Sequence, residues 1–369
     1  MLSAEDSRWM AQALQLAERG LYTTTPNPRV GCVLVQSNNL PGEGKLLGEG
    51  WHERAGEPHA EVHALRAAGV QAEGATAYVT LEPCSHHGRT PPCADALIAA
   101  GVARVVVAMQ DPNPQVSGQG IARLRSAGIE VECGLMEASA RALNPGFISR
   151  MTRGMPFVRS KIAMSLDGRT ALNNGVSQWI TGAEARRDGH HWRARSCVVL
   201  TGIGTVLADD AQLSVREVQT TRQPLRVVLD STLQIPLSAR ILQGGNVLIY
   251  TAIRDVQKIS ALEKLGAKIE VFPANKGQVD LVACLKDLAA RGCNEVLVEA
   301  GRTLNGAMLQ ANLIDELVLY LAPQLLGDMA RGMAQLGELT SLDQRIDLAW
   351  QDVRQVGKDL RIVANVKRG

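Results

Sequence analysis

The sequence His59-Ala60-Glu61, together with Pro83-Cys84 and Cys93 further on, decides how the first half of the chain is interpreted. One imidazole and two thiols are the three protein ligands that a catalytic zinc site uses while a fourth position holds water. Glu61 stands two residues after the histidine, where its carboxylate can move protons without binding the metal. The pattern is typical of zinc-dependent nucleobase deaminases, although eight residues separate the two cysteines here instead of two.

A structural zinc is the alternative interpretation of the same residues. Such a site normally closes with a fourth cysteine or histidine, and His63, His86 and His87 are close enough in sequence to supply it. Glu61 has no purpose in a structural site, so we favour the catalytic interpretation. We expect one zinc ion per chain and Glu61 as the catalytic residue. The expected metal ligands are His59, Cys84 and Cys93.

The composition is that of a chain with two ordinary globular domains. Its 369 residues suffice for two cores, and 46% of them are hydrophobic. A formal net charge of +2 and an aromatic content of 3% argue against a nucleic-acid partner. Seven cysteines, an odd number, do not suggest a disulfide framework. The chain shows no signal-peptide pattern and no apolar run near the ~20 residues of a membrane helix, so we expect a cytoplasmic protein without membrane contact.

Apolar strands alternate with helical segments along the whole chain, which predicts an α/β protein of two three-layer α/β domains. The pattern changes near Asn144-Pro145-Gly146, where we expect the boundary. The predicted parts are a first domain over residues 1–147, a short basic linker over 148–156 and a second domain over 157–369. In the second domain, apolar runs predict strands at 157–163, 197–201, 226–230, 246–250, 268–272, 295–298 and 315–322.

Two glycine-bearing turns follow predicted strands of the second domain, one at 201–206 and the other at 299–307. Backbone amides in such a turn, at the start of a helix, can hold a phosphate group. Neither turn completes the G-x-G-x-x-G pattern, so a Rossmann dinucleotide fold is disfavoured.

With these residues assembled, the chain resembles the bifunctional deaminase–reductase family of bacterial riboflavin biosynthesis. The first half carries the matching motifs Thr25-Pro26-Asn27-Pro28, His59-Ala60-Glu61 and the run 83–93, whose eight-residue spacing is the form of this family. The second half carries matching motifs at 165–169, 177–181, 205–210 and 298–301. The resemblance implies an N-terminal cytidine-deaminase-like domain and a C-terminal dihydrofolate-reductase-like domain.

For the first domain, the resemblance implies hydrolysis of the 2-amino group of a diaminopyrimidinone that carries a phosphoribosylamino arm. Glu61 would pass protons to the ring nitrogen and to the leaving ammonia. The residues expected to hold the ring and the phosphate are Asn27, His52, His86, Arg89 and Asn113.

For the second domain, the resemblance implies reduction of the ribosyl group to ribityl with NADPH. Cofactor contacts are implied for Ala163, Trp179, Thr205, Asp209, Gly301, Arg302, Thr303, Leu304, Asn305, Gly306 and Ala307. Substrate contacts are implied for Lys161, Ser177, Arg193, Leu213, Arg216 and Glu299. Ala211 and Arg302 depart from the usual residues of the family. A role in surface salt bridges is an equally good interpretation of Arg193 and Arg216 taken alone.

The expected partner is a small phosphoribosyl pyrimidine, and we expect the chain to form a homo-oligomer, a dimer or a tetramer. One alternative is an RNA-directed base deaminase with an appended RNA-binding domain, which the charge balance and low aromatic content disfavour. The other is a zinc-stabilised scaffold without activity. That alternative predicts that Glu61→Gln leaves every biochemical property intact.

Overall fold

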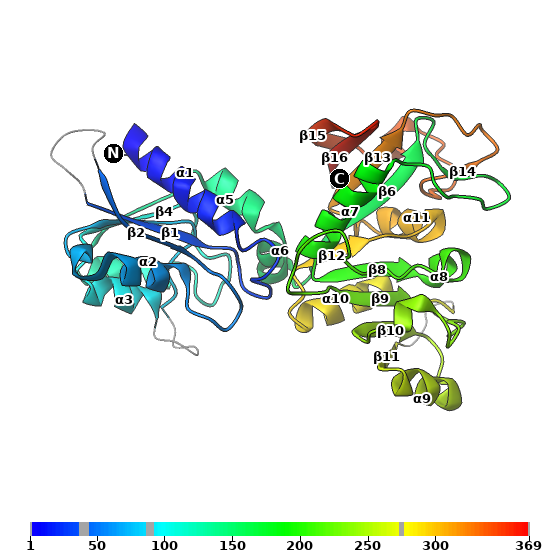
Figure 1. Cartoon of the computed structure of the whole chain (residues 1–369), viewed down its shortest axis with the longest axis horizontal. Coiled ribbons are helices and arrows are strands. Elements are labelled where there is room, and N and C mark those ends of the chain that lie inside the picture. The colour runs from blue at the N-terminus through cyan, green and yellow to red at the C-terminus, as the bar shows by residue number, and fades with distance from the viewer. Residues whose placement is uncertain (1, 37–43, 86–91, 273–276, 368–369) are drawn as a thin grey trace. The chain divides into compact units, whose positions relative to one another are not determined.

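The structure, a computed structural model, describes residues 2–36, 44–85, 92–272 and 277–367. The chain divides into two compact units, Met1–Gly154 and Met155–Gly369, whose elements are labelled in Figure 1. Each unit has its own sheet and its own hydrophobic core. The division falls within the predicted linker, 148–156.

The first unit contains a five-stranded sheet made of β1 (Gly31–Gln36), β2 (Lys45–Trp51), β3 (Thr76–Val79), β4 (Arg104–Val107) and β5 (Glu130–Cys133). The spatial order is β2-β1-β3-β4-β5. β1 pairs antiparallel with β2 and with β3, whereas β3, β4 and β5 are parallel. Because β3 and β4 run in the same direction, the segments that follow them leave the sheet at the same edge.

Helices cover both faces of this sheet. One face carries α1 (Ala4–Glu18) and α5 (Glu137–Leu143), and the other carries α2 (Ala60–Ala68), α3 (Cys93–Ala99) and α4 (Gln119–Ser126). Helix α2 lies against β2 at a short distance because Gly48 and Gly50 have no side chains. A Cβ atom at Gly48 would lie 2.3 Å from the carbonyl oxygen of Ala64. This close approach fixes the start of α2, where His59 precedes the helix.

Most of the segment predicted as a linker is helical. Helix α6 spans Pro145–Arg153 and belongs to the first unit. The buried Asn144 side chain precedes it, accepting from the Arg29 backbone N–H at 2.8 Å and donating to the Arg29 carbonyl at 2.9 Å. Arg150 donates to the carbonyl oxygen of Pro26 at 3.0 Å. Arg150, one of the basic residues that suggested a linker, therefore contacts the loop that carries Asn27.

The second unit contains a nine-stranded sheet made of β6 (Phe157–Ser165), β8 (Val198–Gly202), β9 (Leu225–Leu229), β10 (Val247–Thr251), β11 (Ala267–Val271), β12 (Glu295–Val298), β13 (Glu316–Ala322), β15 (Leu348–Val356) and β16 (Asp359–Val366). The spatial order is β11-β10-β9-β8-β12-β6-β13-β16-β15. All neighbours are parallel except the last two pairs, in which β16 runs antiparallel to β13 and to β15.

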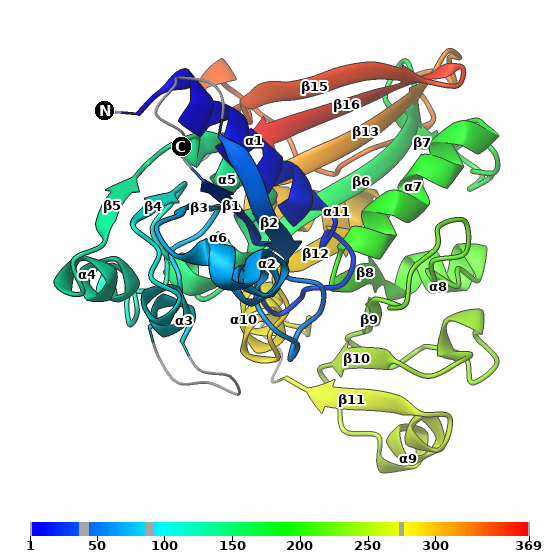
Figure 2. The ribbon, with the colours of Figure 1, turned by 60° about the vertical axis from the view of Figure 1, so that its left-hand side comes forward.

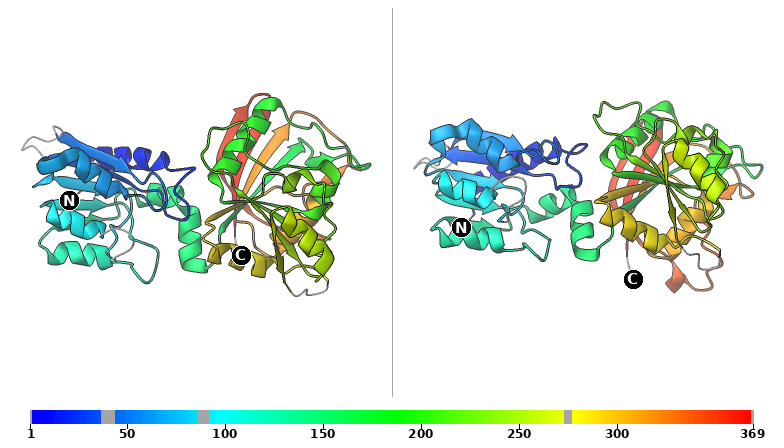
Figure 3. Two further views of the ribbon diagram at one scale, coloured as in Figure 1. Left: turned by 60° about the horizontal axis from the view of Figure 1, so that its bottom comes forward. Right: turned by 90° about the horizontal axis from the view of Figure 1, so that it is seen from below.

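The two faces of this sheet belong to separate cores, because side chains alternate along each strand. Along β8, Val198 and Leu200 join one core and Val199 joins the other. Helices α10 (Leu281–Ala290) and α11 (Arg302–Gln310) cover the first face. Helices α8 (Ile203–Asp209) and α9 (Val256–Lys264) contribute to the core on the second. Figures 2 and 3 show helices on both faces, so this unit is also a three-layer structure.

Helix α7 (Ala183–Arg195) packs on the sheet through charged and polar groups. Asp188 accepts from the Tyr320 hydroxyl at 2.5 Å and from Arg361 at 2.8 Å. The Trp192 ring faces the guanidinium group of Arg159, which is buried and pairs with two glutamates. These contacts allow few alternative positions of α7 along the sheet.

The predicted fold class, two three-layer α/β domains, is confirmed. Each of the seven strands predicted in the second domain overlaps an observed strand. The strands not predicted are β15, β16 and the short pair β7 (Arg169–Ala171) and β14 (Arg331–Gly332). β15 is an edge strand in which five of the nine residues are exposed and polar residues interrupt the apolar ones, so it lacks the apolar run that indicates a buried strand. Among the described residues, no helix combines the length and the apolar character needed to cross a membrane.

Candidate functional site

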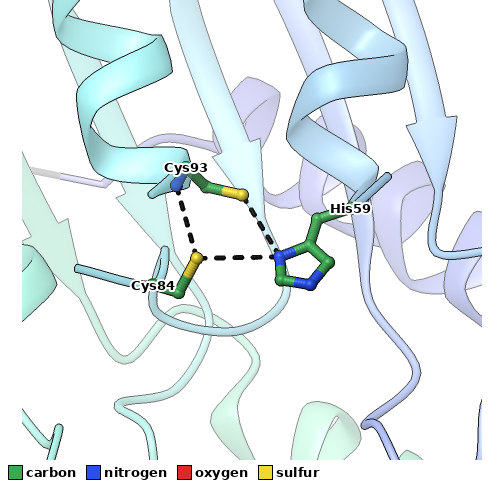
Figure 4. Close-up of side chains that lie close together, drawn as sticks. All are labelled: His59, Cys84 and Cys93. Carbon is green, nitrogen blue, oxygen red and sulfur yellow. Dashed lines mark hydrogen bonds between the residues drawn. The ribbon is translucent and has the colours of Figure 1, made fainter. Parts of the chain in front are cut away.

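The three predicted metal ligands come together in the first unit. His59 is the residue before α2, Cys84 lies in the irregular segment after β3, and Cys93 is the first residue of α3. His59 Nδ1 lies 3.6 Å from the Cys84 sulfur and 3.3 Å from the Cys93 sulfur. Figure 4 shows the imidazole nitrogen directed at both sulfur atoms.

These distances fit a tetrahedral zinc site. Zinc–nitrogen and zinc–sulfur bonds of about 2.0 and 2.3 Å at tetrahedral angles place a nitrogen and a sulfur ligand about 3.6 Å apart. All three ligand atoms lie within 4.8 Å of one another, and this is the one such cluster found in the described part of the chain. Three ligands from the protein leave a fourth position for water, which is the arrangement of a catalytic site.

Glu61 lies in the first turn of α2 and has the properties of a proton-transfer group. Its side chain is buried, and its Oε2 atom has no hydrogen-bond partner within the described residues. A buried carboxylate oxygen without a partner is costly unless a ligand or a water molecule serves it. Burial raises the pKa of Glu61 to about 7, despite the opposing effect of His59. A group with such a pKa can take up and release protons near neutral pH.

Local hydrogen bonds favour the thiolate form of Cys84. The Cys93 backbone N–H, at the start of α3, donates to the Cys84 sulfur at 3.3 Å. Hydrogen bonding from Cys93 and from His59 lowers the pKa of Cys84 below its usual value. Thiolate is the form that binds metal. The local geometry therefore prepares Cys84 to bind a divalent cation.

Two of the residues expected to hold the pyrimidine lie together beside the metal ligands. Asn27 Nδ2 lies 3.0 Å from His52 Nε2, and His52 Nδ1 lies 3.2 Å from the Pro58 carbonyl oxygen. The rings of His52 and His59 meet edge to face, with 5.2 Å between their centroids. Burial lowers the pKa of His52, so its ring is neutral near pH 7. The side-chain NH₂ group of Asn27 then donates to His52 Nε2. The Oδ1 atom of Asn27 is left to accept a hydrogen bond from a ligand.

The third of these residues, Asn113, lies in the loop after β4. Its backbone N–H donates to Asp111 Oδ1 at 2.8 Å, and its own Oδ1 accepts from Gln115 N–H at 3.1 Å. This loop and the segment that carries Cys84 both follow parallel, neighbouring strands. The two remaining predicted residues, His86 and Arg89, lie outside the described residues.

The second unit contains a cavity of about 1310 Å³. The predicted reductase residues that line it are Lys161, Ala163, Ser177, Trp179, Arg193, Thr205, Asp209, Leu213, Arg216, Glu299, Gly301, Arg302, Thr303, Leu304 and Ala307. Asn305 and Gly306 do not line it. Asn305 is buried and donates to the carbonyl oxygens of Ala300 and Met333, and Gly306 lies against the backbone of Gln335.

Glu299 is the centre of a charged cluster on the cavity wall. Its carboxylate accepts from Arg193 Nε at 2.5 Å and Nη2 at 2.9 Å, and lies 3.4 Å from Lys161 Nζ. Burial alone would raise the pKa of Glu299, but the charges of Arg193 and Lys161 outweigh burial and hold it well below its usual value. Arg193 is thus no exposed salt-bridge residue, since its side chain is mostly buried beside the cavity.

His190 connects this cluster to Arg216. Its Nδ1 atom accepts from the Arg216 backbone N–H at 3.2 Å, and its ring is buried one turn before Arg193 on α7. Burial and the neighbouring charges of Arg193 and Arg216 lower the pKa of His190 to about 4. The ring therefore stays neutral near pH 7. The Arg216 side chain donates to Gln212 at 3.2 Å and to Ser214 at 3.1 Å.

The glycine turns leave room for a cofactor to approach. A Cβ atom at Gly204 or at Gly301 would meet no atom within 4 Å, and both residues line the cavity. Gly301 precedes α11, so the unpaired amides of its first turn lie beside this space. A dinucleotide phosphate fits such a turn. The residues present are therefore compatible with a bound nicotinamide dinucleotide.

Some residues around these sites were not predicted. Arg186 lies over the Trp179 ring, with its guanidinium carbon 4.5 Å from the ring centroid, and both residues line the cavity. His190 and Glu82 were also missed. Neither forms part of a motif, so only the folded structure reveals their contacts.

Comparisons with known proteins agree with this division. Residues 3–109 match the family described as "Cytidine and deoxycytidylate deaminase zinc-binding region". Residues 156–362 match the family described as "RibD C-terminal domain". A reductase family over the second half gives no support to the alternative of an appended RNA-binding domain.

Full-length relatives include two proteins named "Riboflavin biosynthesis protein RibD". The protein of Escherichia coli K12 is 50% identical, over 96% of this chain and 98% of its own length. That of Haemophilus influenzae is 45% identical, over 99% of this chain and 98% of its own length.

Solved structures give the same result. Acinetobacter baumannii RibD is 48% identical with a TM-score of 0.91, and the match covers 99% of each chain. A deaminase/reductase from Thermotoga maritima is 31% identical with a TM-score of 0.86, over 98% of this chain and 99% of that one. The chain therefore belongs to the RibD family of bifunctional riboflavin biosynthesis enzymes, which combine a zinc-dependent deaminase domain with an NADPH-dependent reductase domain.

Proposed function

We propose that the first unit deaminates 2,5-diamino-6-(5-phosphoribosylamino)pyrimidin-4(3H)-one, and that the second reduces the ribosyl side chain of the product to ribityl. The Thermotoga maritima relative is described as a diaminohydroxyphosphoribosylaminopyrimidine deaminase and 5-amino-6-(5-phosphoribosylamino)uracil reductase. The observation that carries the proposal is the buried Oε2 of Glu61, which has no hydrogen-bond partner in the described part of the chain, near three residues that can bind one metal ion.

In the deaminase reaction, each residue near the metal has a distinct task. His59, Cys84 and Cys93 would hold a zinc ion, which would supply Lewis-acid activation of a water molecule. Glu61 accepts the two protons of the water molecule in turn and delivers one to the ring nitrogen and one to the departing amino group, which leaves as ammonia. Asn27 presents its Oδ1 atom to the ring because its amide nitrogen is engaged by His52.

The phosphate-bearing arm and the far side of the ring require further contacts. Asn113 has an amide nitrogen that no described residue engages, and we assign it to the substrate. His86 and Arg89 remain predictions for the phosphate, since a cationic side chain suits an anionic arm that free nucleosides lack.

In the reductase reaction, a bound NADPH would supply the hydride for C1′ of the sugar, and the protein's own residues position the substrate and the cofactor. The substrate-facing residues are Lys161, Ser177, Arg193, Leu213, Arg216 and Glu299. Cofactor contacts are assigned to Ala163, Trp179, Thr205, Asp209 and to the cavity-lining part of the turn, Gly301, Arg302, Thr303, Leu304 and Ala307. Asn305 and Gly306 are assigned to packing beneath the cavity, because neither lines it.

We also infer that the chain acts as a homo-oligomer, a dimer or a tetramer, in the cytoplasm. Edge strand β15 exposes Trp350 and Val353, which supports association through apolar contacts. The structure joins none of the cysteines in its described residues by a disulfide, which supports a reducing compartment.

The test is a double assay of the purified, zinc-loaded chain given the diaminopyrimidinone ribosyl phosphate and NADPH. Ammonia release and NADPH oxidation are followed in parallel. We expect ammonia to appear first and NADPH consumption to follow, with NADH a poorer reductant.

Each failure has a separate meaning. Absence of ammonia would overturn the deaminase substrate. Ammonia without oxidation of NADPH would keep the deaminase and overturn the proposed reductase substrate or the contacts assigned to Arg302 and its neighbours.

A further inference from the structure

Glu82 is a buried carboxylate that the proposed chemistry does not use. It lies just after β3, two residues before Cys84, and its backbone N–H donates to the Met109 carbonyl oxygen at 3.0 Å. Its side chain accepts four backbone hydrogen bonds. Oε2 accepts from Asp111 at 3.0 Å and from Gly118 at 2.9 Å, and Oε1 accepts from Gly120 at 2.9 Å and from Ile121 at 3.2 Å.

The four amides belong to two parts of one segment. Asp111 and Gly118 stand at the two ends of the loop that contains Asn113, and Gly120 and Ile121 lie in the first turn of α4. One carboxylate therefore closes the loop at both ends and satisfies amides at a helix start, where they have no partner within the helix.

Other contacts bring the same segment close to Cys84. A Cβ atom at Gly120 would lie 2.0 Å from the Pro83 carbonyl oxygen, so only glycine permits this approach. Arg123 of α4 donates to the Ser85 carbonyl oxygen at 3.5 Å and forms an ion pair with Asp95 of α3. Helix α4, which directly follows the loop with Asn113, is thus held against the segment that carries Cys84.

A carboxylate suits this position better than any neutral side chain. It has only acceptor atoms, and hydrogen bonds from N–H groups to an ionised oxygen are stronger than neutral ones. Glutamine has nearly the same shape but presents an NH₂ group in place of one oxygen. Two of the four amides would then face a donor instead of an acceptor.

We infer that Glu82 is a positioning residue for deamination: it fixes the loop that carries Asn113 at a set distance from the metal ligand Cys84. The inference rests on the proposed contact between Asn113 and the substrate. Displacement of a contact group by about 1 Å is enough to lower catalytic efficiency by roughly 100-fold.

The first experiment compares Glu82→Gln with Glu18→Gln, a matched change at an exposed glutamate on α1. Zinc content, ammonia release and NADPH oxidation are measured in the full chain. We expect KM for the deaminase substrate to rise roughly tenfold or more in Glu82→Gln, with kcat much less affected. Zinc should stay at one per chain, and the NADPH-dependent step should be unchanged. Glu18→Gln should match the unsubstituted chain throughout.

A double-mutant cycle with Asn113→Ala separates positioning from general loosening of the fold. If Glu82 acts through Asn113, the double variant should be no worse than Asn113→Ala alone. An unchanged KM in Glu82→Gln, loss of zinc, or an additive double variant would each overturn the inference. If Asn113→Ala itself leaves KM unchanged, the proposed Asn113 contact fails and the inference falls with it. If Asn113→Ala raises KM but Glu82→Gln does not, the inference about Glu82 fails while the proposed contact between Asn113 and the substrate stands.

Hydrogen exchange in the unsubstituted chain gives a test that does not depend on a variant folding. The amides of Asp111 and Gly118 belong to a surface loop but should exchange as slowly as those of α4, because Glu82 engages them. Exchange at the rate of an unbonded surface amide would contradict the arrangement.

Discussion

The deaminase site and the reductase cavity are built in opposite ways. In the first unit, the metal ligands and Glu61 lie within residues 59–93, each at or near the start of a short helix or just after a strand. In the second, the cavity is lined by residues from Lys161 to Arg331, drawn from many elements. A metal needs a few atoms at set distances, whereas a cofactor that carries the chemistry needs a surface that holds it. One substitution should therefore abolish deamination, while reduction should weaken by degrees.

The largest effect is expected for Glu61→Gln. Glutamine keeps the shape but cannot transfer protons, so ammonia release should fall by roughly 10²- to 10⁴-fold. Zinc content should stay at one per chain, and NADPH oxidation with the already deaminated substrate should equal that of the unsubstituted chain. Ammonia release at the original rate would refute the role of Glu61 and favour a structural zinc.

In the reductase unit, Glu299→Gln should have the largest effect, yet a partial one. Removal of the charge leaves Lys161 and Arg193 without their buried counter-ion, which costs about 3 kcal/mol of unfolding free energy. Arg193 still donates to the Ser214 carbonyl oxygen, so the cavity wall should persist with a raised KM for the reductase substrate. Denaturant unfolding and steady-state kinetics check this, with Glu338→Gln, an exposed glutamate, as the control. Complete loss of reduction without loss of stability would contradict a graded response.

The free energy of unfolding should depend on pH through His190 of the second unit. Its pKa is about 4 in the folded chain and about 6.5 in an unfolded one. Between these values the unfolded chain binds a proton that the folded chain does not. The free energy of unfolding therefore falls as the pH drops from about 6.5 toward 4. In His190→Gln, the slope of the free energy of unfolding against pH should be shallower, because the contribution of up to one bound proton is lost. Denaturant unfolding at several pH values measures this slope. An unchanged slope would show that His190 is protonated in the folded state.

The smallest effect is expected for Gly301→Ala. The backbone of Gly301, with φ −81° and ψ 177°, suits alanine, and the added methyl group would meet no protein atom within 4 Å. Stability should stay within about 0.5 kcal/mol of the unsubstituted chain. KM for NADPH should rise about threefold, a change below 1 kcal/mol, because the methyl group enters the space assigned to the cofactor. An unaltered KM would place the cofactor elsewhere in the cavity.

The same contrast explains what could be predicted from the sequence. His59, Glu61, Cys84 and Cys93 were identifiable because metal chemistry restricts both residue type and spacing. Most reductase residues came instead from resemblance to a family, since an arginine or a glycine in isolation has several ordinary roles.

Contacts that depend on tertiary structure escaped prediction. Glu82 and His190 act through backbone amides distant in sequence, and nothing in their local sequence indicates those partners. The helix within the predicted linker was missed for a related reason. The arginines near residue 150 suggested an exposed segment, but Arg150 and Asn144 bind backbone atoms of the loop that carries Asn27. Edge strand β15, in which no residue is buried, lacked an apolar run to mark it.

The attachment of helix α6 to that loop matters to anyone who wishes to produce the deaminase half alone. A fragment cut after residue 147, at the boundary predicted from sequence, would retain Asn144 but lose Arg150 and most of α6. The Pro26 carbonyl would then lose its partner, and Asn27 would be less firmly held beside His52. A fragment cut after Gly154 keeps the whole helix. The seven residues between the two cuts are therefore a working part of the enzyme, and expression vectors for the separate half should include them.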